Sequence, residues 1–598
     1  MKKLIYLILL CSPIVGVAKP PVTSMSGSNL SKRASHVSTI SNLQAYTGTA
    51  KTIIVTDHLK GGLFSLVKGS YTADGGTIFA AKGLNPGKYW RRSYRGALNV
   101  NWFGAKGDSA TDNTIAIQAA FTAGANKKIV IPAGKYMINA LKGVFPPANT
   151  TIEFAKGAEF DVIPNSSVNY NCINIRNVNN VTLINPVIIG DRIGHTGTKG
   201  EWGMGIFIGG ASKSIKLINP KVSNCWGDGI YVDGGSDIYI ENMFCDNNRR
   251  QGMSIISVTG LLVKGALVTN SNGTPPQSGI DIEPDYDTDV LDNISLLNVT
   301  TKNNKLGYGV TINLNSFTTL NKDINITIEN HKDYGSFNSI GINNVGSGKA
   351  VLKGAITIKD SYSENALGNG IYVTNYGASN TPLLKIIKPV VINPNTGSTG
   401  AAKYGSGISI VREGACPATN VMGNLIVEQP SIVDNRAKPL MINGIYAIDE
   451  KGIGFSNAKI NNPLKIKGVG AHESIICNTD GFSVKDSLKA VALVSNSGYN
   501  FTIHMSAISL VTNTGANSLT PFTLDQNHDF DSPITFVNNT SFGLTIKPAS
   551  GYNILPISTV AGGLIKTTQI GASITIKRLN STSYIIVNKK GDWTVEGN

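Results

Sequence analysis

Two carboxylates in the segment SGIDIEP (residues 278–284) have the spacing of a catalytic pair. Asp281 and Glu283 are two residues apart, so on a β-strand their side chains share one face and lie about 6.5 to 7 Å apart. A separation of about 6.5 to 9.5 Å leaves room for a water between the acid and the base of an inverting glycosidase. We therefore predict Glu283 as general acid and Asp281 as general base. The alternative is a pair of solvated acids that form ion pairs with Arg249 or Arg250.

Three further charged residues have two interpretations each. Asp228, in CWGDGIYV, precedes a glycine where a turn enters a strand. It is either a third acid or a turn residue hydrogen-bonded to its own backbone. Arg249 and Arg250 either clamp a uronate carboxylate through bidentate hydrogen bonds or form a solvent-exposed basic turn.

The segment GDRIGHTGTKGEWGMGI (residues 190–206) predicts a sugar-binding loop. Trp202 offers a flat face for a pyranose ring, and Glu201 lies beside it. His195 titrates near neutral pH, although a single histidine in a glycine-rich loop is more often structural than catalytic. We expect all three residues to contact substrate.

Other catalytic patterns are absent from the sequence. There is no phosphate-binding loop, no zinc-protease motif and no convincing Ser-His-Asp set, so phosphoryl transfer and peptide hydrolysis have no support in the sequence. Asp285, Asp287 and Asp289 alternate and could give calcium oxygen ligands, but the later glutamate of an EF-hand loop is missing. We expect no cofactor, with calcium as the alternative.

A recurring glycine followed by alternating apolar residues indicates the architecture that must position these groups. The glycine mark occurs nine times between residues 205 and 444, at intervals of 23 to 37 residues: Gly205, Gly229, Gly252, Gly279, Gly309, Gly341, Gly370, Gly407 and Gly444. Such a period is typical of stacked structural units. Each unit has room for three short strands, which predicts one coil of a parallel β-helix.

Stacking of these coils would bring further residues to the carboxylate pair. In each coil, residues one and three places after the glycine should face the core, and those two and four places after it should face outward. The outward places hold Tyr231 and Asp233 in one coil, and Gln251 precedes the mark of the next. With coils about 4.8 Å apart, Asp233 should lie on the order of 10 Å from Glu283. We predict that Asp233 assists catalysis and that Tyr231 and Gln251 bind substrate.

The beginning of the repeat resembles a known group. In GAKGDSATDNTIAIQAAF, Asp112 is expected to cap a helix over about residues 113–121 that would cover the open end of the solenoid. Together with IVIPAGKY, this segment resembles the opening of the pectate-lyase-like superfamily, in the branch of rhamnogalacturonases, epimerases and tailspike depolymerases. The resemblance covers roughly residues 98–480 and implies an all-β, right-handed parallel β-helix. Its members hydrolyse, eliminate, epimerise or only bind sugars, so it leaves the reaction open.

The flanking regions are expected to form separate parts. Residues 1–18 read as a secretory signal peptide, and residues 19–40 as a flexible lead-in. Residues 41–97 resemble the small β-rich piece that precedes the helix in tailspike-like proteins, and 98–480 would be the β-helix. From 481 to 598 the glycine mark stops and alternating strands predict a β-sandwich-like domain. The resemblance gives this end a trimerisation or carbohydrate-binding role and implies a homotrimer.

Composition and charge restrict the partners. The 598 residues include 65 Gly and only 15% charged residues, and the net charge is +15, or +13 without Lys2 and Lys3. A basic surface attracts polyanions. The basic residues are dispersed, which argues against nucleic acid, and no later apolar run would insert into a membrane. The five cysteines after the signal peptide are unevenly spaced and predict no disulfide framework.

The sequence therefore predicts a polysaccharide depolymerase that is secreted, or located at the cell surface or in the periplasm, after cleavage of the signal peptide. Its expected substrate is an acidic bacterial surface or extracellular polysaccharide, and its expected reaction is glycoside hydrolysis. A polysaccharide lyase or uronate epimerase is the enzymatic alternative, and a glycan-binding adhesin without catalysis is the other.

Overall fold

The computed structural model describes residues 35–346, 348–413, 421–449, 451, 453–469, 475–477, 482–485, 492–493, 501–503, 510–512, 521–524, 533–559 and 561–596. The predicted signal peptide lies outside these residues, as does the lead-in up to residue 34. The chain divides into two compact units, one ending at Arg95 and one beginning at Gly96. Within the described residues, no helix is both long and apolar enough to cross a membrane.

From residue 35 onward, the first unit is a small sheet with one helix. Its five strands are arranged in the order β1-β2-β3-β5-β4 around buried Leu43, Phe64 and Trp90. Strand β1 and the start of helix α2 lie within residues 35–40, which were predicted to belong to the flexible lead-in (residues 19–40). The elements are β1 (Ser35–Val37), α2 (Ile40–Ala45), β2 (Thr52–Val55), β3 (Gly62–Lys68), β4 (Ile78–Ala80) and β5 (Lys88–Ser93).

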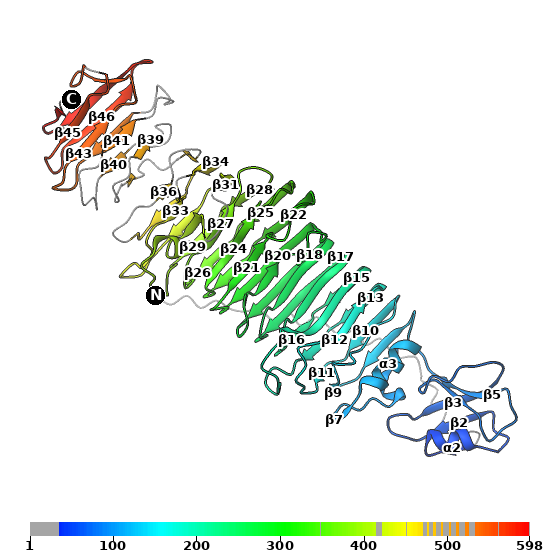
Figure 1. The fold of residues 1–598 in the computed structure, drawn as a ribbon. Helices are drawn as coiled ribbons and strands as arrows, with labels where there is room; N and C mark the ends of the chain where they lie inside the picture. Colours follow the sequence, from blue (N-terminus) through cyan, green and yellow to red (C-terminus); the bar gives the residue numbers. More distant parts are fainter. Residues whose placement is uncertain are drawn as a thin grey trace, which may run out of the picture. The chain divides into compact units, whose positions relative to one another are not determined.

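The second unit contains a 32-stranded sheet in which all pairings between the described strands are parallel, so the prediction of an all-β, right-handed parallel β-helix is confirmed. Figure 1 shows the strands following one another along the solenoid in sequence order. Each complete coil contributes three strand segments, and segments of the same kind pair from coil to coil to make three faces. We call the face that directly follows the glycine mark the first face, and the next two the second and third faces.

Four long strands bend and contribute to more than one face. They are β15 (Trp202–Ile218), β17 (Ile230–Asp246), β18 (Met253–Thr269) and β20 (Leu291–Lys302). The other first-face strands are β12 (Asn169–Arg176), β19 (Ile280–Ile282), β21 (Tyr308–Asn313), β24 (Asn338–Val345), β27 (Ile371–Tyr376), β30 (Ile408–Val411), β33 (Ile445–Ile448) and β36 (Ile475–Cys477).

The other strands of the β-helix belong to the second and third faces. The second-face strands are β6 (Leu98–Asn99), β8 (Lys128–Ile131), β10 (Thr150–Phe154), β13 (Asn179–Ile184), β22 (Lys322–Glu329), β25 (Leu352–Lys359), β28 (Leu383–Ile387), β31 (Met422–Glu428), β34 (Phe455–Asn461) and β37 (Phe482–Lys485). The third-face strands are β7 (Asp108–Asp112), β9 (Gly134–Ile138), β11 (Ala158–Val162), β14 (Val187–Ile189), β16 (Lys221–Ser223), β23 (Lys332–Tyr334), β26 (Tyr362–Glu364), β29 (Val390–Ile392), β32 (Ser431–Val433) and β35 (Lys465–Lys467).

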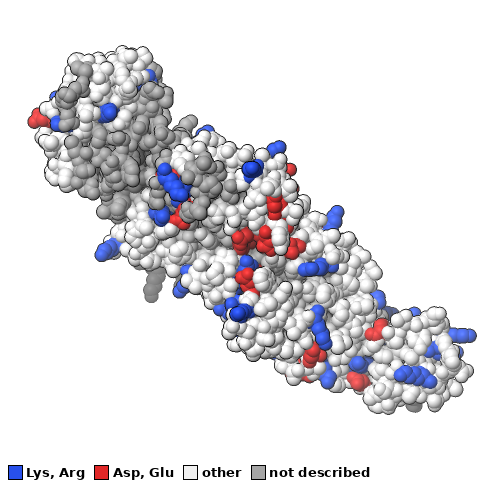
Figure 2. Space-filling model, viewed as in Figure 1, with Lys and Arg blue, Asp and Glu red and all other residues white. Residues whose placement is uncertain are grey.

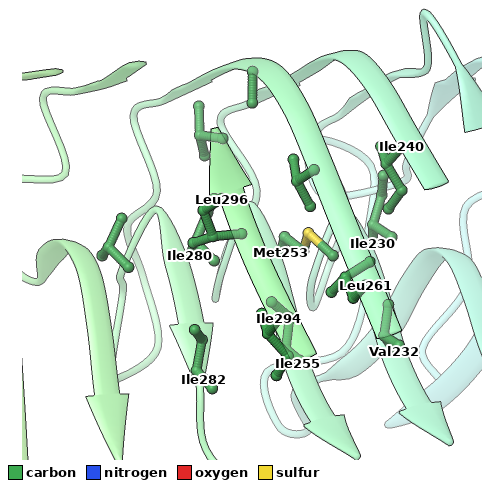
Figure 3. Packing of buried hydrophobic residues seen from close by; sticks show 14 of the residues in the cluster. Ile230, Val232, Ile240, Met253, Ile255, Leu261, Ile280, Ile282, Ile294 and Leu296 are labelled. Carbon is green, nitrogen blue, oxygen red and sulfur yellow. The ribbon is translucent and has the colours of Figure 1, made fainter. Parts of the chain in front are cut away.

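The core is built from apolar residues stacked in register. Ile230, Met253 and Ile280 pair from coil to coil and are fully buried, as Figure 3 shows. The glycine mark has a steric cause, because a Cβ on Gly279 would lie 2.5 Å from the carbonyl oxygen of Gly309 in the next coil. Among the described cysteines, Cys172, Cys225, Cys245 and Cys477 are free thiols.

One of the nine glycines was assigned to the wrong place. Ile340 pairs with Val310, so Gly341 is opposite Thr311 and Ser339 occupies the position of the mark. Gly341 is therefore an outward position. The ring of Tyr308 explains its identity, because it lies where a Cβ of residue 341 would be.

A short helix covers the first coils. Helix α3 (Thr114–Ala123) packs Ile117, Ala120 and Phe121 into the solenoid core, and the 3₁₀ helix η1 (Val100–Phe103) lies beside it. We had predicted Asp112 as the N-cap residue, but the N-cap is Asn113. Asp112 still contributes, because its Oδ1 accepts a hydrogen bond at 2.9 Å from the backbone N–H of Thr114.

Asparagines with a left-handed backbone make the bends between the second and third faces. Asn185, Asn219 and Asn242 have φ angles of 52°, 52° and 53°. Their side chains form a ladder, with Asn242 donating to Asn219 at 3.0 Å and Asn219 donating to Asn185 at 2.8 Å. Asn330 donates to Asn298 in the same way at 2.6 Å. Asparagine tolerates positive φ better than most side chains, so it suits both the bend and the ladder.

The β-helix pairing extends past the expected boundary at residue 480, because β37 pairs in parallel with β34 and Phe482 joins the core. Farther on, the described strands form a six-stranded and a five-stranded sheet. Early strands of both sheets pair in parallel, and antiparallel pairs follow. These strands are β38 (Ala492–Leu493), β39 (Phe501–Ile503), β40 (Leu510–Thr512), β41 (Pro521–Leu524), β42 (Ile534–Val537), β43 (Leu544–Lys547), β44 (Asn553–Leu555), β45 (Leu564–Thr567), β46 (Ser573–Arg578), β47 (Ser583–Lys590) and β48 (Thr594–Glu596).

Candidate functional site

The predicted acid pair lies on the first face at strand β19. Ile280 and Ile282 face the core, and Asp281 between them belongs to the opposite side of the strand. Asp281 is nevertheless only 2% exposed, whereas Glu283 is half-buried. The interpretation of Asp281 as a solvated surface acid is therefore excluded, because neighbouring side chains cover it.

The two carboxyl groups contact each other. The pKa of Asp281 is raised well above its ordinary value by burial, then by the charge of Glu283, and by a side-chain hydrogen bond to Glu283. No N–H or O–H group faces Oδ1 of Asp281, so a proton shared with Glu283 would satisfy this buried oxygen. A direct hydrogen bond leaves no room for a water between the two carboxyl groups, which differs from the predicted spacing of an inverting acid and base.

Asp228 is the centre of a buried hydrogen-bond network. Its side chain is fully buried, and it accepts hydrogen bonds from the Gln251 backbone at 2.9 Å, Ser254 Oγ at 2.8 Å and Arg250 Nη1 at 3.0 Å. Burial raises the pKa of Asp228, and Arg250 opposes that effect. Asp228 is thus held by residues of the next coil, and not by its own backbone as in a simple turn.

Gln251 connects Asp228 to the acid pair. Its backbone N–H binds Asp228, and its side-chain Nε2 donates to Asp281 Oδ2 at 2.6 Å. The side-chain Oε1 accepts from the backbone of Ser278 at 2.9 Å. Gln251 is fully buried. We had predicted it as a substrate ligand, and the structure places it in internal hydrogen bonds.

Arg250 joins the buried network to the surface. Burial would lower its pKa, but the charge of Asp228 and then those of Asp281 and Glu201 raise it. Its Nε lies 3.6 Å from Glu201 Oε2, and the Glu201 side chain is 31% exposed. Asp228, Arg250, Glu201, Asp281 and Glu283 therefore form one connected cluster of charges, which we call the acid cluster.

Asp233 and Tyr231 lie beside the acid cluster on β17. Burial and the charges of Asp289 and Asp285 raise the pKa of Asp233. The hydroxyl of Tyr231 donates to Asp285 at 3.2 Å, and its ring stacks on Phe207. The strand pairing shifts at Asp233, which is opposite Ser257. Strand β17 pairs with β18, and β18 pairs with β19, so Asp233 lies two coils from the Glu283 coil, as predicted.

Acidic side chains gather midway along the solenoid on the face viewed in Figure 2, near β18, β20 and β21, with lysines and arginines around them. Asp287 in this region has a structural role, because its carboxylate accepts hydrogen bonds from the backbone N–H groups of Thr318, Thr319 and Leu320. Within the described residues, no three His, Cys, Asp or Glu side chains are grouped to hold a metal ion.

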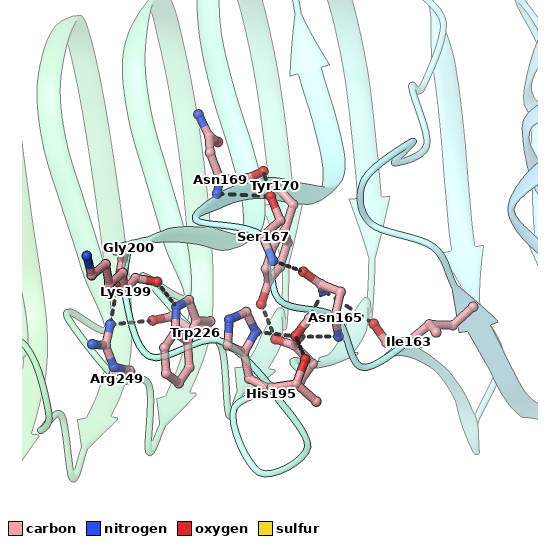
Figure 4. Close-up of polar contacts among 12 residues, drawn as sticks. Ile163, Asn165, Ser167, Asn169, Tyr170, His195, Lys199, Gly200, Trp226 and Arg249 are labelled. Atoms are coloured by element: carbon pink, nitrogen blue, oxygen red, sulfur yellow. Dashed lines mark hydrogen bonds and ion pairs between the residues drawn. The ribbon is translucent and has the colours of Figure 1, made fainter.

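The loop before β15 is fixed by aromatic and polar contacts (Figure 4). His195 stacks on Trp226 with ring centroids 3.8 Å apart, and its Nδ1 lies 2.8 Å from Asp191 Oδ2. Tyr170 and Asn165 also hydrogen-bond to Asp191. The side chains of His195 and Asp191 are inaccessible to solvent. His195 therefore anchors the loop and does not face a substrate.

Arg249 packs on the other side of this stack. Its guanidinium lies 4.0 Å from the ring centroid of Trp226, and Nη1 donates to the carbonyl of Gly200 at 2.6 Å. We had considered both Arg249 and Arg250 as ligands for a uronate carboxylate. Arg249 instead contacts Trp226 and Gly200, and Arg250 forms an ion pair with Asp228. Trp202 differs, since it is 45% exposed and keeps a free aromatic surface beside Glu201.

Several residues of the site were not found from the sequence. Ser254 binds Asp228, Asn313 Nδ2 donates to Glu283 Oε1 at 2.8 Å, and Trp226 supports His195. The register could have revealed Ser254, because it pairs with Asp281 in the next coil. Trp226 follows Cys225 in a turn outside the repeat pattern, and its stacking had no sequence signal.

Comparison with known proteins gives distant similarities. No family model matches the chain. The uncharacterized protein YclG of Bacillus subtilis (strain 168) is 25% identical over 426 residues, covering 65% of this chain and 63% of YclG. The SPbeta prophage-derived uncharacterized protein YorA of the same organism is 27% identical over 188 residues, covering 26% of this chain and 32% of YorA. The chain thus spans less than two thirds of both curated relatives.

One similar solved structure is the tailspike protein gp49 of Acinetobacter baumannii bacteriophage Fri1, described as a capsular polysaccharide depolymerase. It has a TM-score of 0.43 and 13% sequence identity, over 68% of this chain and 76% of that chain.

Proposed function

We propose that the protein is a glycoside hydrolase that acts on an acidic polysaccharide. The observation that carries the proposal is the buried Asp281 carboxyl in contact with the more exposed Glu283. A carboxyl group whose pKa is raised by burial is what general-acid cleavage of a glycosidic bond requires. A surface ion pair would not need this burial.

In this proposal Glu283 contacts the substrate, and the protonated Asp281 carboxyl supplies a proton to Glu283. The half-buried Glu283 donates a proton to the glycosidic oxygen, and the shared proton of the pair supplies it. Asp233 is the proposed base. Two coils correspond to about 9.6 Å, close to the upper end of the separation that accommodates a water in inverting enzymes. This assignment moves the role of base from Asp281, which the Glu283 contact occupies, to Asp233.

The Asp228–Arg250 pair positions the donor. Arg250 is held by Asp228 and also acts on Asp281, where its positive charge opposes the rise in pKa. Gln251 fixes Asp281 from the same coil as Arg250. We propose that these three residues set the proton affinity of Asp281 and do not touch the reacting bond.

The acidic character of the substrate follows from charge. The net charge of +15 favours association with a polyanion, and Trp202 offers a stacking surface for a sugar ring near Glu201. A lyase or epimerase would need a cation free to neutralise a uronate. Arg249 and Arg250 are both engaged, which favours hydrolysis over these alternatives.

The proposal is tested by incubating the protein with capsular and plant acidic polysaccharides and analysing product mass. Hydrolysis should lower polymer size and give saturated products carrying one added water per cleavage. Ultraviolet-absorbing unsaturated products would indicate a lyase, and inverted uronate configuration without chain shortening would indicate an epimerase. Binding of a polymer without any chemical change would indicate an adhesin.

We also propose export through residues 1–18 and assembly as a homotrimer, both on the sequence grounds given above. Amino-terminal sequencing of the secreted protein should begin after residue 18. Light scattering should give three times the mass of the chain, and a monomer at micromolar concentration would contradict the trimer.

A further inference from the structure

A second cluster of polar and aromatic residues lies on the same face as the acid cluster. Asp281 pairs with Thr311, Thr311 with Gly341, and Gly341 with Tyr372. Tyr372 is therefore in the same outward column as Asp281 and three coils away. At about 4.8 Å per coil, this separation is about 14 Å along the solenoid.

Tyr404 and Glu413 come together at Tyr372. Tyr404 ends the 3₁₀ helix η2 (Ala402–Tyr404), and its hydroxyl donates to Oε1 of Glu413, the second residue after β30. The rings of Tyr404 and Tyr372 are 6.0 Å apart with planes at 52°. Lys403 Nζ lies 3.4 Å from Glu413 Oε1. Tyr404, Lys403 and Glu413 are all half-buried, so part of each remains accessible.

Tyr372 forms the buried side of the cluster. It is only 4% exposed. Burial, then the charge of Glu413 and a side-chain hydrogen bond to Glu413, raise the pKa of Tyr372. Both tyrosine hydroxyls of the cluster are therefore directed at the Glu413 carboxylate.

The surface between the two clusters is polar. Asn343 Nδ2 donates to Thr311 Oγ1 at 3.2 Å, and Thr374 Oγ1 donates to Asn343 Oδ1 at 2.9 Å. Next to them, Asn313 contacts Glu283. Thr311 and Thr374 are buried, whereas Asn313 and Asn343 are half-buried. The two half-buried amides could exchange hydrogen bonds with a hydroxyl-rich chain lying along the coils.

We propose that Tyr404, Tyr372 and Glu413 form a second sugar-binding subsite, which holds a pyranose unit of the same polysaccharide whose bond is cleaved at Glu283. This inference rests on the proposed function. The accessible part of the Tyr404 ring stacks on the sugar, and Glu413 accepts hydrogen bonds from its hydroxyls. Since one coil advances by nearly the length of one sugar unit, the subsite lies about three units from the cleaved bond.

A purely structural role for this cluster makes a different prediction. If the Tyr404–Glu413 contact only fixes the η2 loop, its removal should lower stability and leave glycan affinity unchanged. The third face provides a matched control, because Tyr362 also donates its hydroxyl to a glutamate, Glu364, and packs near another tyrosine ring, Tyr334, at 5.9 Å. Tyr362 lies on β26, away from the acid cluster.

The test measures binding in a chain that cannot cleave. Full-length protein carrying Glu283→Gln is titrated with a polysaccharide that the unmodified protein cleaves, and with its di- and trisaccharide fragments. Adding Tyr404→Ala should weaken binding of the polymer about three- to tenfold, the loss typical of one aromatic contact. Binding of fragments too short to span both clusters should change little. Tyr404→Phe keeps the ring and should retain most of the affinity.

Two outcomes would overturn the subsite. In one, Tyr404→Ala binds the polymer as well as its parent; in the other, Tyr362→Ala loses as much affinity as Tyr404→Ala. Melting curves of each variant identify a folding defect, and Tyr404→Phe then decides the question. If cleavage depends on Glu283 while Tyr404 is without effect, only the subsite fails. If no polysaccharide is cleaved or bound, the proposed function fails with it.

Discussion

Asp228 and Asp281 belong to coils on either side of the Gln251 coil, and Gln251 binds both carboxyl groups, one through its backbone and one through its side chain. The two acids are thus parts of one buried network although 53 residues separate them in the sequence. A change at one of them should be felt at the other, because residues that share hydrogen-bond partners do not contribute independently.

Replacing the acid pair should abolish most turnover. Glu283→Gln and Asp281→Asn keep shape and remove proton transfer, so we expect each to lower kcat about a hundred- to ten-thousand-fold. Glu329→Gln is the control, because its carboxylate pairs with Lys359 on the second face. Initial rates of polymer shortening measure the effect. Wild-type rates in both acid variants would place the active site elsewhere, with the exposed Trp202 and Glu201 as the next candidates.

Asp281→Asn should also make the protein more stable at higher pH. The folded-state pKa of Asp281 is raised, so its contribution to stability is fully present below pH 3.8 and is lost as pH rises toward the raised value. Asparagine has no charge to bury. The stability gain of the variant should therefore be near zero at pH 4 and grow by up to about 1.4 kcal/mol per pH unit. Urea denaturation from pH 4 to 8 measures it, and a gain independent of pH would contradict the burial of this carboxylate.

Removing one member of the Arg250–Asp228 pair should be costly. Arg250→Gln leaves the fully buried Asp228 carboxylate without its cation, and we expect a loss of about 3–5 kcal/mol in unfolding free energy. Adding Asp228→Asn removes the uncompensated charge and should recover much of the loss. Lys264→Gln breaks an exposed pair with Glu241 and should cost no more than about 1 kcal/mol. If Arg250→Gln and Lys264→Gln lost the same unfolding free energy, Asp228 would have to be solvated.

A buried histidine in the bend before the third-face strand β23, His331, should make the stability of the fold sensitive to acid. Burial lowers the pKa of His331 from 6.5 to about 3, so its contribution to stability is present above pH 6.5 and is lost as pH falls toward 3. The neighbouring Asp333, whose pKa burial raises to about 6, changes in the opposite sense between pH 3.8 and 6. The stability advantage of wild type over His331→Gln should therefore shrink from pH 7 to pH 4. A constant difference between the two proteins would show that His331 does not titrate in this range.

Polysaccharide affinity should fall with salt. A positively charged surface that attracts a polyanion is screened over a Debye length of about 8 Å near physiological ionic strength. Titrations of the Glu283→Gln protein at low and high salt test this expectation. An affinity that does not change would mean that the net charge of +15 is incidental to binding.

The glycine mark and the strand alternation predicted the solenoid because each coil repeats the same local pattern. They also placed Asp281 and Glu283 on one side of a strand. The burial of Asp281 could not be predicted in this way, because Arg250, Gln251 and Ser254 cover it from another coil. The separation of the two carboxyls depends on their side-chain rotamers, which a strand's rise per residue does not specify.

Two other differences have similar causes. His195 is in a glycine-rich loop, yet its environment is determined by Trp226 from the next coil and by Tyr170 from the previous one. Gly341 matches the repeat pattern but fits under the Tyr308 ring and is not the residue that starts a coil. In both cases the role of the residue depends on which residues of the neighbouring coils lie beside it. Predicting that role requires the pairing register between coils, and the repeat period alone does not give it.

The asparagine ladders give this molecule a discrete length scale. Asn298, in the coil of Asp281, is joined to Asn330 in the next coil toward the tyrosines, and such a bond forms only when neighbouring coils are in register. Two groups in the same outward column can therefore be moved apart or together only by whole coils. Deleting one coil between Asp281 and Tyr372 would shorten their separation by a step of about 4.8 Å. Side chains in one outward column are thus spaced by multiples of the coil separation, which is close to the length of one sugar unit.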